Sequence, residues 1–193
     1  MLRLPPEAAG KTRRRQAKWY DVEGAPVAQN GAGGGVGIHA VQVARAYGAR
    51  VIAVTSPAKA EAVSKYADHV VTGKVFSEEI KKLGGADGAV ETVGGPTLEQ
   101  TLRSLSWGAR VALIGNVDPQ PTPVALGILI LKEIEILPVI QGNMKDLEEA
   151  LQLLARGAVK PVYTVHGFSE LPTLLEETPR ASHVGRRVVR VGN

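Results

Sequence analysis

The sequence predicts an α/β fold in three layers, in which helices cover both faces of a parallel sheet. A glycine-rich stretch, residues 31–37, stands directly before a run with the pattern of an amphipathic helix, Ile38–Tyr47. The strand-like run Arg50–Thr55 follows and completes the loop, helix and second strand of a βαβ unit. Strand-like and helix-like segments then alternate with short connections to about residue 160. This order predicts a doubly wound parallel sheet of the Rossmann type.

The later elements follow from local signals. Proline stands at the first turn of two expected helices, at Pro57 and Pro96, where its missing N–H is tolerated best. The helices expected after the first are Pro57–Tyr66, Ser77–Leu83, Pro96–Leu105, a short helix in the apolar run Val124–Ile140, Lys145–Leu154 and Ser169–Glu176. The strands expected after the second are His69–Val71, Gly88–Glu91, Arg110–Gly115, Ile134–Ile140, Val162–Val165 and Arg187–Val191.

The segment before the glycine-rich stretch carries a weak strand signal. Its run Ala25–Asn30 has a single β-branched residue, Val27, and contains Pro26. Because proline cannot donate a hydrogen bond to a neighbouring strand, we expect the first strand to be short or poorly ordered.

The composition indicates one globular domain. The chain has 193 residues, of which 44% are hydrophobic and 22% charged, and this is enough for one sizeable core. It contains no cysteine, which excludes disulfides, thiolate nucleophiles and cysteine-based zinc sites. The four histidines show no ligand spacing such as HExxH. We therefore expect no metal site within this chain.

The apolar and charged runs argue against membrane and nucleic-acid partners. The longest apolar stretch, Val124–Ile140, contains charged residues and a proline, so it is not a membrane span. No apolar signal-peptide core stands near Met1, and a cytoplasmic location is expected. The net charge of +4 is concentrated in a basic run, which we interpret as a solvated leader because no nucleic-acid-binding motif accompanies it: Lys11, Arg13, Arg14, Arg15 and Lys18.

The glycine-rich stretch predicts a phosphate site. Glycines let the backbone turn tightly and approach a ligand, while the first N–H groups of the following helix face the anion. Counted back from Gly37, the pattern is Ala32-x-Gly34-x-x-Gly37, so alanine takes the first glycine position of a dinucleotide fingerprint. The alternative is a glycine-rich surface turn.

The end of the second strand indicates which dinucleotide is bound. A carboxylate there would hold the ribose of NAD, whereas hydroxyl residues with a nearby cation accept the 2′-phosphate of NADP. Thr55 and Ser56 stand at this point, and Lys59 follows. No acid is present, so NADP is the expected cofactor and NAD the second choice. In the alternative interpretation, Thr55 and Ser56 only cap the next helix.

Three stretches carry a resemblance to a known family: GAGGGVGIHAVQVARAYGARVIAVT, ETVGGPTLEQTLRSLSWGARVALIGNVDP and KDLEEALQLLARGAVKPV. They resemble the coenzyme-binding domain of the medium-chain dehydrogenase/reductase superfamily, which includes zinc-type alcohol dehydrogenases. Within it they are most similar to the acryloyl-coenzyme A reductase and quinone oxidoreductase-like branch. The resemblance covers roughly residues 31–191. It implies an oxidoreductase that moves a hydride between a nicotinamide and a carbonyl or activated C=C bond of a small molecule.

The resemblance also implies which residues bind the cofactor, while it assigns no catalytic residue to this chain. The implied residues are Gly34, Gly35, Val36, Gly37 and Arg186 at the pyrophosphate, Thr55, Ser56 and Lys59 at the 2′-phosphate, Thr92 and Val93 on the adenosine side, and Ile114, Gly115, Asn116, Val117 and Gly142 toward the nicotinamide.

The resemblance further suggests how the chain is divided. In the superfamily a catalytic domain precedes the coenzyme domain, whereas only about thirty residues precede the glycine-rich stretch here. We therefore assign residues 1–24 to a basic leader or a remnant of a preceding domain. Residues 25–193 form the nucleotide-binding domain with a C-terminal extension. The alternative function is a non-enzymatic dinucleotide-binding or assembly module derived from such an enzyme.

The apolar segment Ile128–Ile140 predicts self-association. It is more apolar than an edge strand should be, and an exposed edge of this kind invites pairing with another chain. By resemblance, the same segment pairs strands across a two-fold axis, so a homodimer is expected. The alternative is that this segment is an interior strand of the monomer.

Overall fold

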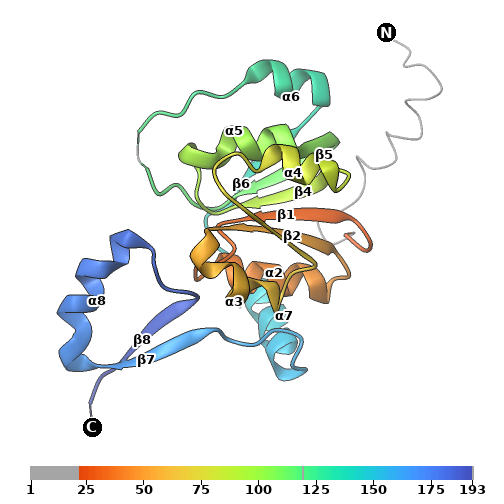
Figure 1. Ribbon diagram of the computed structural model, residues 1–193. Coiled ribbons are helices and arrows are strands. Elements are labelled where there is room, and N and C mark those ends of the chain that lie inside the picture. The colour runs from red at the N-terminus through yellow and green to blue at the C-terminus, as the bar shows by residue number, and fades with distance from the viewer. Residues whose placement is uncertain (1–21, 119, 193) are drawn as a thin grey trace.

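The computed structural model describes residues 22–118 and 120–192, and its main element is a six-stranded parallel sheet (Figure 1). The strand order is β3-β2-β1-β4-β5-β6, and all neighbours are parallel. The expected doubly wound α/β fold is therefore confirmed. The basic run at residues 11–18 lies outside the described residues. The strands are β1 (Pro26–Asn30), β2 (Arg50–Thr55), β3 (His69–Thr72), β4 (Ala86–Glu91), β5 (Leu105–Leu113) and β6 (Glu135–Pro138).

The first strand corrects the expectation from sequence. β1 has five residues and lies at the centre of the sheet, where it pairs with both β2 and β4. Pro26 is its first residue, which is a position where a strand tolerates proline, and the four residues that follow are buried. The expectation was wrong because two neighbouring strands and two helix layers stabilise β1, whereas its own β-propensity is low.

The central strands present alternate residues to two separate cores. Val27 of β1 belongs to the core on the side of α2 (Gly37–Ala46) and α3 (Ala60–Ser64). Its neighbour Ala28 belongs to the opposite core, built with α4 (Ser77–Lys82) and α5 (Gly95–Ser104). Figure 1 shows these helices on opposite sides of the sheet. Because both faces are covered, the central strand β2 is apolar over Val51–Val54, as buried parallel strands are.

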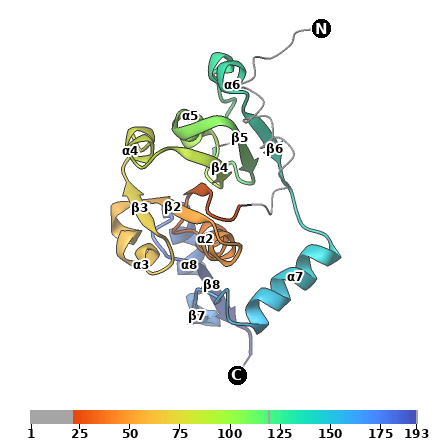
Figure 2. The same ribbon diagram turned by 90° about the vertical axis from the view of Figure 1, so that its right-hand side faces the viewer.

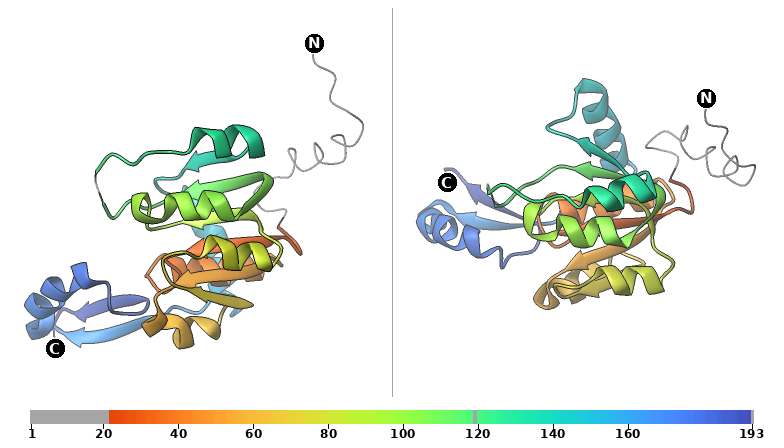
Figure 3. Two further views of the ribbon diagram at one scale, coloured as in Figure 1. Left: turned by 45° about the horizontal axis from the view of Figure 1, so that its top comes forward. Right: turned by 90° about the horizontal axis from the view of Figure 1, so that it is seen from above.

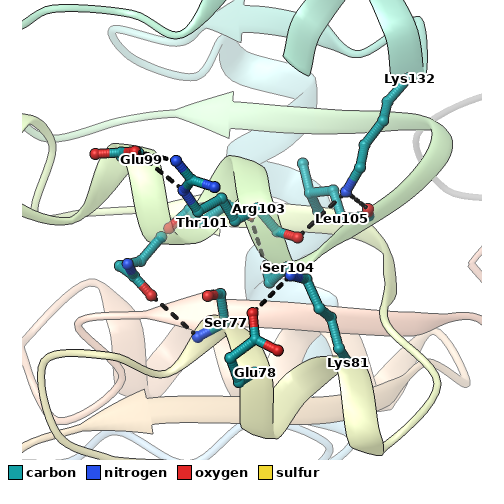
Figure 4. Close-up of polar contacts among 10 residues, drawn as sticks. Ser77, Glu78, Lys81, Glu99, Thr101, Arg103, Ser104, Leu105 and Lys132 are labelled. Carbon is teal, nitrogen blue, oxygen red and sulfur yellow. Dashed lines mark hydrogen bonds and ion pairs between the residues drawn. The ribbon is translucent and has the colours of Figure 1, made fainter.

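Polar contacts connect the helices on the second face (Figure 4). Lys132, the last residue of α6 (Leu126–Lys132), donates from Nζ to the carbonyl oxygens of Leu105 at 2.6 Å and Arg103 at 3.2 Å. The backbone N–H of Ser77 donates to the side-chain oxygen of Gln100 at 3.3 Å. These bonds fix both α4 and α6 against the C-terminal half of α5.

β5 begins earlier than the sequence suggested. It starts at Leu105 instead of Arg110, and its pairing with β4 jumps from Ala86↔Leu105 to Gly88↔Arg110. Gly108 lies within this bulge with φ +69°. Glycine with a positive φ is typical of turns. For this reason the sequence pattern around Gly108 suggested a turn before the strand, whereas the structure has a bulge within it.

The C-terminal part forms a separate small unit that projects away from the main sheet (Figures 2 and 3). It follows α7 (Met144–Ala155) and contains two parallel strands, β7 (Tyr163–Gly167) and β8 (Arg186–Arg190). Helix α8 (Leu171–Glu177), with the short helices η3 (Phe168–Glu170) and η4 (Thr178–Arg180), connects the two strands. No helix in the part of the chain that the structure describes is long and apolar enough to cross a membrane.

Candidate nucleotide-binding site

The candidate site lies at the carboxyl ends of the central strands. In the observed order, β1 stands between β2 and β4, so the chain continues in opposite directions on either side of it. Ligands of doubly wound sheets bind in the crevice at this switch point. The glycine-rich stretch, residues 31–37, connects β1 to α2 at the same place.

Two glycines let the loop turn back on itself. Gly31 has φ +70°, and its carbonyl oxygen accepts a hydrogen bond from the N–H of Gly34 at 2.9 Å. A Cβ at Gly37 would overlap this same carbonyl oxygen. At Gly34, by contrast, an added Cβ would lie 3.3 Å from the Gly31 oxygen and near no other atom. Gly37 is therefore required for packing, whereas a Cβ at Gly34 would make a single tight contact.

The N-terminus of α2 is open to a ligand. Its first turn contains no acidic residue, and no side chain caps it. Within the described residues, the N–H groups of Gly35, Val36 and Gly37 donate to no protein acceptor. Free N–H groups and the positive end of a helix together favour an anion.

The residues that end β2 lie against the same loop. A Cβ at Gly33 would approach Lys59 Cδ at 2.5 Å and Thr55 Oγ1 at 2.8 Å. Ser56 is the N-cap residue of the short helix η2 (Pro57–Lys59), but its side chain forms no capping hydrogen bond. Its hydroxyl group is exposed and free to meet a ligand. The hydrogen bond that a helix-capping role of Ser56 would require is therefore not formed.

Lys59 is a buried cation, with 8% of its surface exposed. It forms no ion pair with the residues that the structure describes. Burial lowers the pKa of its ammonium group, because the charged form is poorly solvated there. An anion bound beside Lys59 would offset that cost.

A further cation reaches the loop from the C-terminal unit. A Cβ at Gly35 would overlap the side chain of Arg186, which therefore lies directly over the loop. The placement of Arg186 follows from backbone contacts, because the N–H of Gly185 donates to the carbonyl oxygen of Gly33 at 3.1 Å. Gly34 and Gly185 also form an isolated parallel bridge. The arginine that the resemblance assigned is thus brought to the loop.

The ends of β4 and β5 complete the crevice. A Cβ at Gly31 would overlap the Thr92 hydroxyl and lie 3.1 Å from Val93 Cγ2. A Cβ at Gly115 would overlap the carbonyl oxygen of Thr92. The N–H of Val117 donates to the carbonyl oxygen of Val93 at 2.9 Å. The chain at Thr92–Val93 and at Ile114–Val117 is therefore held next to the glycine loop, with Ile114 and Val117 exposed.

Gly142 has its neighbours in α7 and not in the glycine loop. It is exposed, and the nearest atoms to a Cβ at this position all belong to Asp146 of α7. Its neighbour Asn143 caps that helix through a reciprocal capping box with Asp146. The role that the resemblance assigned to Gly142 stays a prediction.

Several residues at the site were missed by sequence reasoning. Asn30 and Glu91 are buried polar residues at the ends of β1 and β4, and their side chains bond to each other. His39 bonds to the glycine loop, and His183 lies where the charges of Arg187, Lys59 and Arg186 act on it. Burial is the main cause that lowers the pKa of His183, followed by these cations. The only available signal for Asn30 and Glu91 was a polar residue ending a buried strand.

The described residues do not fit a metal. No three side chains among histidine, aspartate and glutamate gather there in a way that could hold an ion, and the sequence has no cysteine.

Comparison with known proteins identifies relatives of this chain. Residues 35–156 match the family model described as zinc-binding dehydrogenase. The acryloyl-coenzyme A reductase of Metallosphaera sedula is 50% identical over 148 residues, which cover 75% of this chain and 44% of that protein. The acryloyl-coenzyme A reductase of Sulfurisphaera tokodaii is 48% identical over 142 residues, or 72% of this chain and 42% of that protein.

A solved structure shows the same fold. The alcohol dehydrogenase of Aeropyrum pernix superposes with a TM-score of 0.81 at 26% identity, over 95% of this chain and 54% of that one. This chain spans less than half of the length of the two reductases it matches. The family model and these relatives agree with the observed sheet and glycine loop, and the chain belongs to the zinc-binding dehydrogenase family of the medium-chain dehydrogenase/reductase superfamily, of which it carries the cofactor-binding domain.

Proposed function

We propose that this domain binds NADP(H), with NAD(H) as the weaker ligand, and serves an oxidoreductase that reduces an activated C=C or carbonyl bond. One observation carries the proposal: an uncapped helix N-terminus behind a glycine loop, with the cation Lys59 against Gly33 and the cation Arg186 against Gly35. Dinucleotides carry phosphates at the spacing of such a loop and its flanking strand end.

The pyrophosphate would lie over Gly34, Gly35, Val36 and Gly37. The free N–H groups there would donate to phosphate oxygens, and the open space at Gly34 gives the ligand room. Arg186 would add a charged donor from the opposite side. An arginine suits this role because its planar guanidinium group can contact two oxygens at once.

The 2′-phosphate would lie at Thr55, Ser56 and Lys59. The uncapped Ser56 hydroxyl and the unpaired Lys59 ammonium group support this assignment. The absence of an acid at the end of β2 argues against a ribose held as in NAD enzymes. Thr92, Val93, Ile114, Gly115, Asn116 and Val117 would then line the remainder of the cofactor, with Gly142 assigned by resemblance alone.

Calorimetric titration with NADPH and NADH tests the cofactor. We expect NADPH to bind about tenfold more tightly or better, because a charge-assisted phosphate contact contributes about 1.5–3 kcal/mol. Lys59→Met should remove most of this preference and leave NADH affinity unchanged within about twofold. Lys65→Met, an exposed lysine at the end of α3, is the matched control. Equal or tighter binding of NADH to the unaltered chain would refute the NADP assignment.

The proposed reaction class comes from the relatives that are named acryloyl-coenzyme A reductases. When bound, the reduced nicotinamide would supply a hydride to the substrate. The side chains described here would bind and orient the cofactor, and exposed apolar residues such as Ile114 and Val117 would border the substrate side. Acyl-coenzyme A thioesters, quinones and alcohol-derived carbonyls are the substrate classes to compare in the longer protein.

Self-association is proposed on the edge strand. β6 ends the sheet, and its outer edge pairs with no strand of the described chain. Apolar side chains on both sides of β6 in the sequence are exposed, among them Ile130 and Leu131 of α6 and Ile140 after the strand. An uncovered apolar edge supports a homodimer through residues 128–140.

A further inference from the structure

A carboxylate with no cationic partner is buried beneath the candidate site. Glu91 ends β4 and has no exposed surface. It forms no ion pair with any residue that the structure describes. A buried charge of this kind is costly unless hydrogen-bond donors surround it. The nucleotide contacts proposed above do not use it, so its presence needs a reason.

Donors from three segments surround the two oxygens of Glu91. Oε1 accepts from the N–H groups of Val93 at 2.8 Å and Gly94 at 2.9 Å, and from the Thr97 hydroxyl at 3.1 Å. Oε2 accepts from the Thr101 hydroxyl at 2.6 Å. Asn30 donates from Nδ2 to both oxygens, at 3.1 and 2.9 Å. Every lone-pair direction is therefore used by the protein itself.

Asn30 connects Glu91 to the phosphate loop through hydrogen bonds to both. It is the last residue of β1, directly opposite Glu91 in the parallel ladder. While its Nδ2 donates to Glu91, its Oδ1 accepts from the N–H of Gly31 at 2.8 Å. Only one orientation of the amide satisfies both neighbours, because the carboxylate needs a donor and the N–H needs an acceptor.

Gly31 is the residue on which the loop conformation depends. It has φ +70°, its carbonyl oxygen accepts from Gly34, and Gly37 packs on that same oxygen. The Thr92 hydroxyl also donates to the carbonyl oxygen of Asn30 at 2.6 Å, which ties the end of β4 to the start of the loop. Fixing Asn30 therefore fixes the direction in which the loop leaves the sheet.

The same carboxylate occupies the N-terminal end of α5. The N–H groups of Val93 and Gly94 and the hydroxyl of Thr97 belong to the entry of this helix. The carboxylate of Glu91 thus neutralises the positive end of α5. The positive end of α2, by contrast, has no capping side chain and no acidic residue. Of α2 and α5, only α2 is therefore left to attract an anion at its N-terminus.

We infer that Glu91 and Asn30 form a buried clamp that holds the phosphate loop in its binding conformation and directs the pyrophosphate to α2. Both are positioning residues, since neither faces the ligand. The inference rests on the proposed nucleotide-binding function. It also predicts a property of the free protein, namely protection of the loop backbone from exchange with water.

A swap of the two polar groups tests the clamp. Glu91→Gln places an amide N–H₂ against the Asn30 amide or the Thr101 hydroxyl, and Asn30→Asp places two carboxylates against each other. Each single substitution should weaken NADPH binding about tenfold to a hundredfold, because the charged hydrogen bond that holds Asn30 in place beneath Gly31 is lost. The double variant Asn30→Asp/Glu91→Gln restores a donor facing a carboxylate. It should recover most of the lost affinity, which general destabilisation would not allow.

Two further variants separate the clamp from simple stability. Thr101→Val removes one hydrogen bond to Glu91 without touching the loop, and it should leave NADPH affinity within about twofold of the unaltered chain. Asn30→Ala removes the link to Gly31 at a smaller steric cost and replaces Asn30→Asp if that variant does not fold. The NADPH affinity of Asn30→Ala should fall by the same factor as that of the single substitutions above.

Hydrogen exchange of the free protein gives a readout that needs no ligand. The backbone N–H groups of Gly31, Ala32 and Gly34, which are hydrogen-bonded in the loop, should exchange faster in Glu91→Gln and Asn30→Ala, and at the original rate in Thr101→Val. If the unaltered chain does not bind NADPH, the proposed function fails while exchange still tests the clamp. If the unaltered chain binds and Glu91→Gln and Asn30→Ala bind equally well, the clamp is refuted. Failure of the double variant to recover affinity would also overturn it.

Discussion

At the scale of single residues, the loop glycines serve different purposes, although the sequence presents them as one run. A side chain at Gly37 would overlap the backbone of Gly31, so the strand and the helix could not approach each other. A side chain at Gly34 would enter the space that the proposed phosphate occupies. A side chain at Gly37 should therefore impair folding, whereas a side chain at Gly34 should impair binding.

Valine substitutions should show this separation. Gly37→Val should lower the free energy of unfolding by at least about 2 kcal/mol, because the added atoms meet backbone that cannot move aside. Gly34→Val should change the melting temperature by only a few degrees, yet abolish NADPH binding. Thermal denaturation and calorimetry measure both effects. Unchanged affinity in a folded Gly34→Val variant would show that the loop is not the phosphate site.

The titration of Lys59 gives a pH dependence with a definite sign. Burial lowers the pKa of its ammonium group below the ordinary lysine value in the free protein. As the pH rises through that lowered pKa, the ammonium group is lost and the 2′-phosphate loses its cation. The preference for NADPH over NADH should therefore decrease between neutral and alkaline pH. Titrations at several pH values check this, and Lys59→Met should show a flat profile.

At the scale of elements, the position of Arg186 depends on helix α2. His39 donates from Nδ1 to the carbonyl oxygen of Gly35 at 2.7 Å, and its Nε2 accepts from the N–H of Val162 at 3.0 Å. The neutral ring with its proton on Nδ1 satisfies both partners. One turn along the same helix, Gln42 exchanges two hydrogen bonds with the backbone of Lys160, at 2.8 and 3.0 Å.

These contacts fix the segment that leads into β7, and the chain at Val162 in turn fixes β8. The carbonyl oxygen of Val162 accepts from the N–H of Arg186 at 2.9 Å. A path of hydrogen bonds therefore runs from the glycine loop through His39 and Val162 back to the arginine that lies over the loop. Side chains of α2 therefore hold the C-terminal unit in place through hydrogen bonds to its backbone.

A double-mutant cycle tests this path. Arg186→Met should weaken NADPH binding about tenfold, since it removes a charged hydrogen bond. His39→Ala should weaken binding by a similar factor, because Arg186 is no longer held over Gly35. The two effects should not add in the double variant if they act through one contact. Tyr47→Phe, which alters a contact of α2 with α7, is the control and should have no effect. Additive losses would contradict the path.

At the scale of the whole molecule, the exposed apolar residues lie mainly in three places. They are the segment 126–140 with α6 and β6, the helix α7, and the small sheet β7–β8 with α8. Parallel sheets are normally covered on both faces, yet β7 and β8 expose Val165 and Val188. Such surfaces indicate partners of the folded domain.

The edge of β6 should decide the oligomeric state. We expect light scattering of the chain to give the mass of a dimer. Ile140→Lys, directly beyond the edge strand and almost fully exposed, should shift the mass to that of a monomer. Val165→Lys, on the distant β7, should leave the mass unchanged. A monomeric mass of the unaltered chain at high concentration would rule out this dimer.

The chain by itself should bind the cofactor without efficient turnover. A hydride acceptor must lie about 3–3.5 Å from the nicotinamide and be shielded from water. In the proposed site, Ile114–Val117 would supply one wall of that space. We expect NADPH oxidation by quinones, enals or acryloyl-coenzyme A to proceed near the uncatalysed rate. Steady turnover that is lost in Gly34→Val would contradict this.

The sequence by itself predicted the architecture, which the structure confirms, and with the family resemblance it named the candidate site. Glycine spacing, strand and helix periodicity and the hydroxyl pair at Thr55 and Ser56 predicted a doubly wound sheet with its loop at the end of β1. Such features are local in the chain, because turn chemistry and periodicity act over a few residues. The site residues of the loop, of β2 and of the ends of β4 and β5 do meet around one crevice, as the sequence suggested.

Tertiary structure decided what depends on residues far apart in the chain. It made a strand of the proline-bearing segment at Pro26, because β2 and β4 pair with it on both sides. It joined Asn30 to Glu91, and it placed His39 against Val162, across 61 and 123 residues. A buried polar side chain is stable only when distant donors and acceptors surround it, and these partners become visible only in the folded chain.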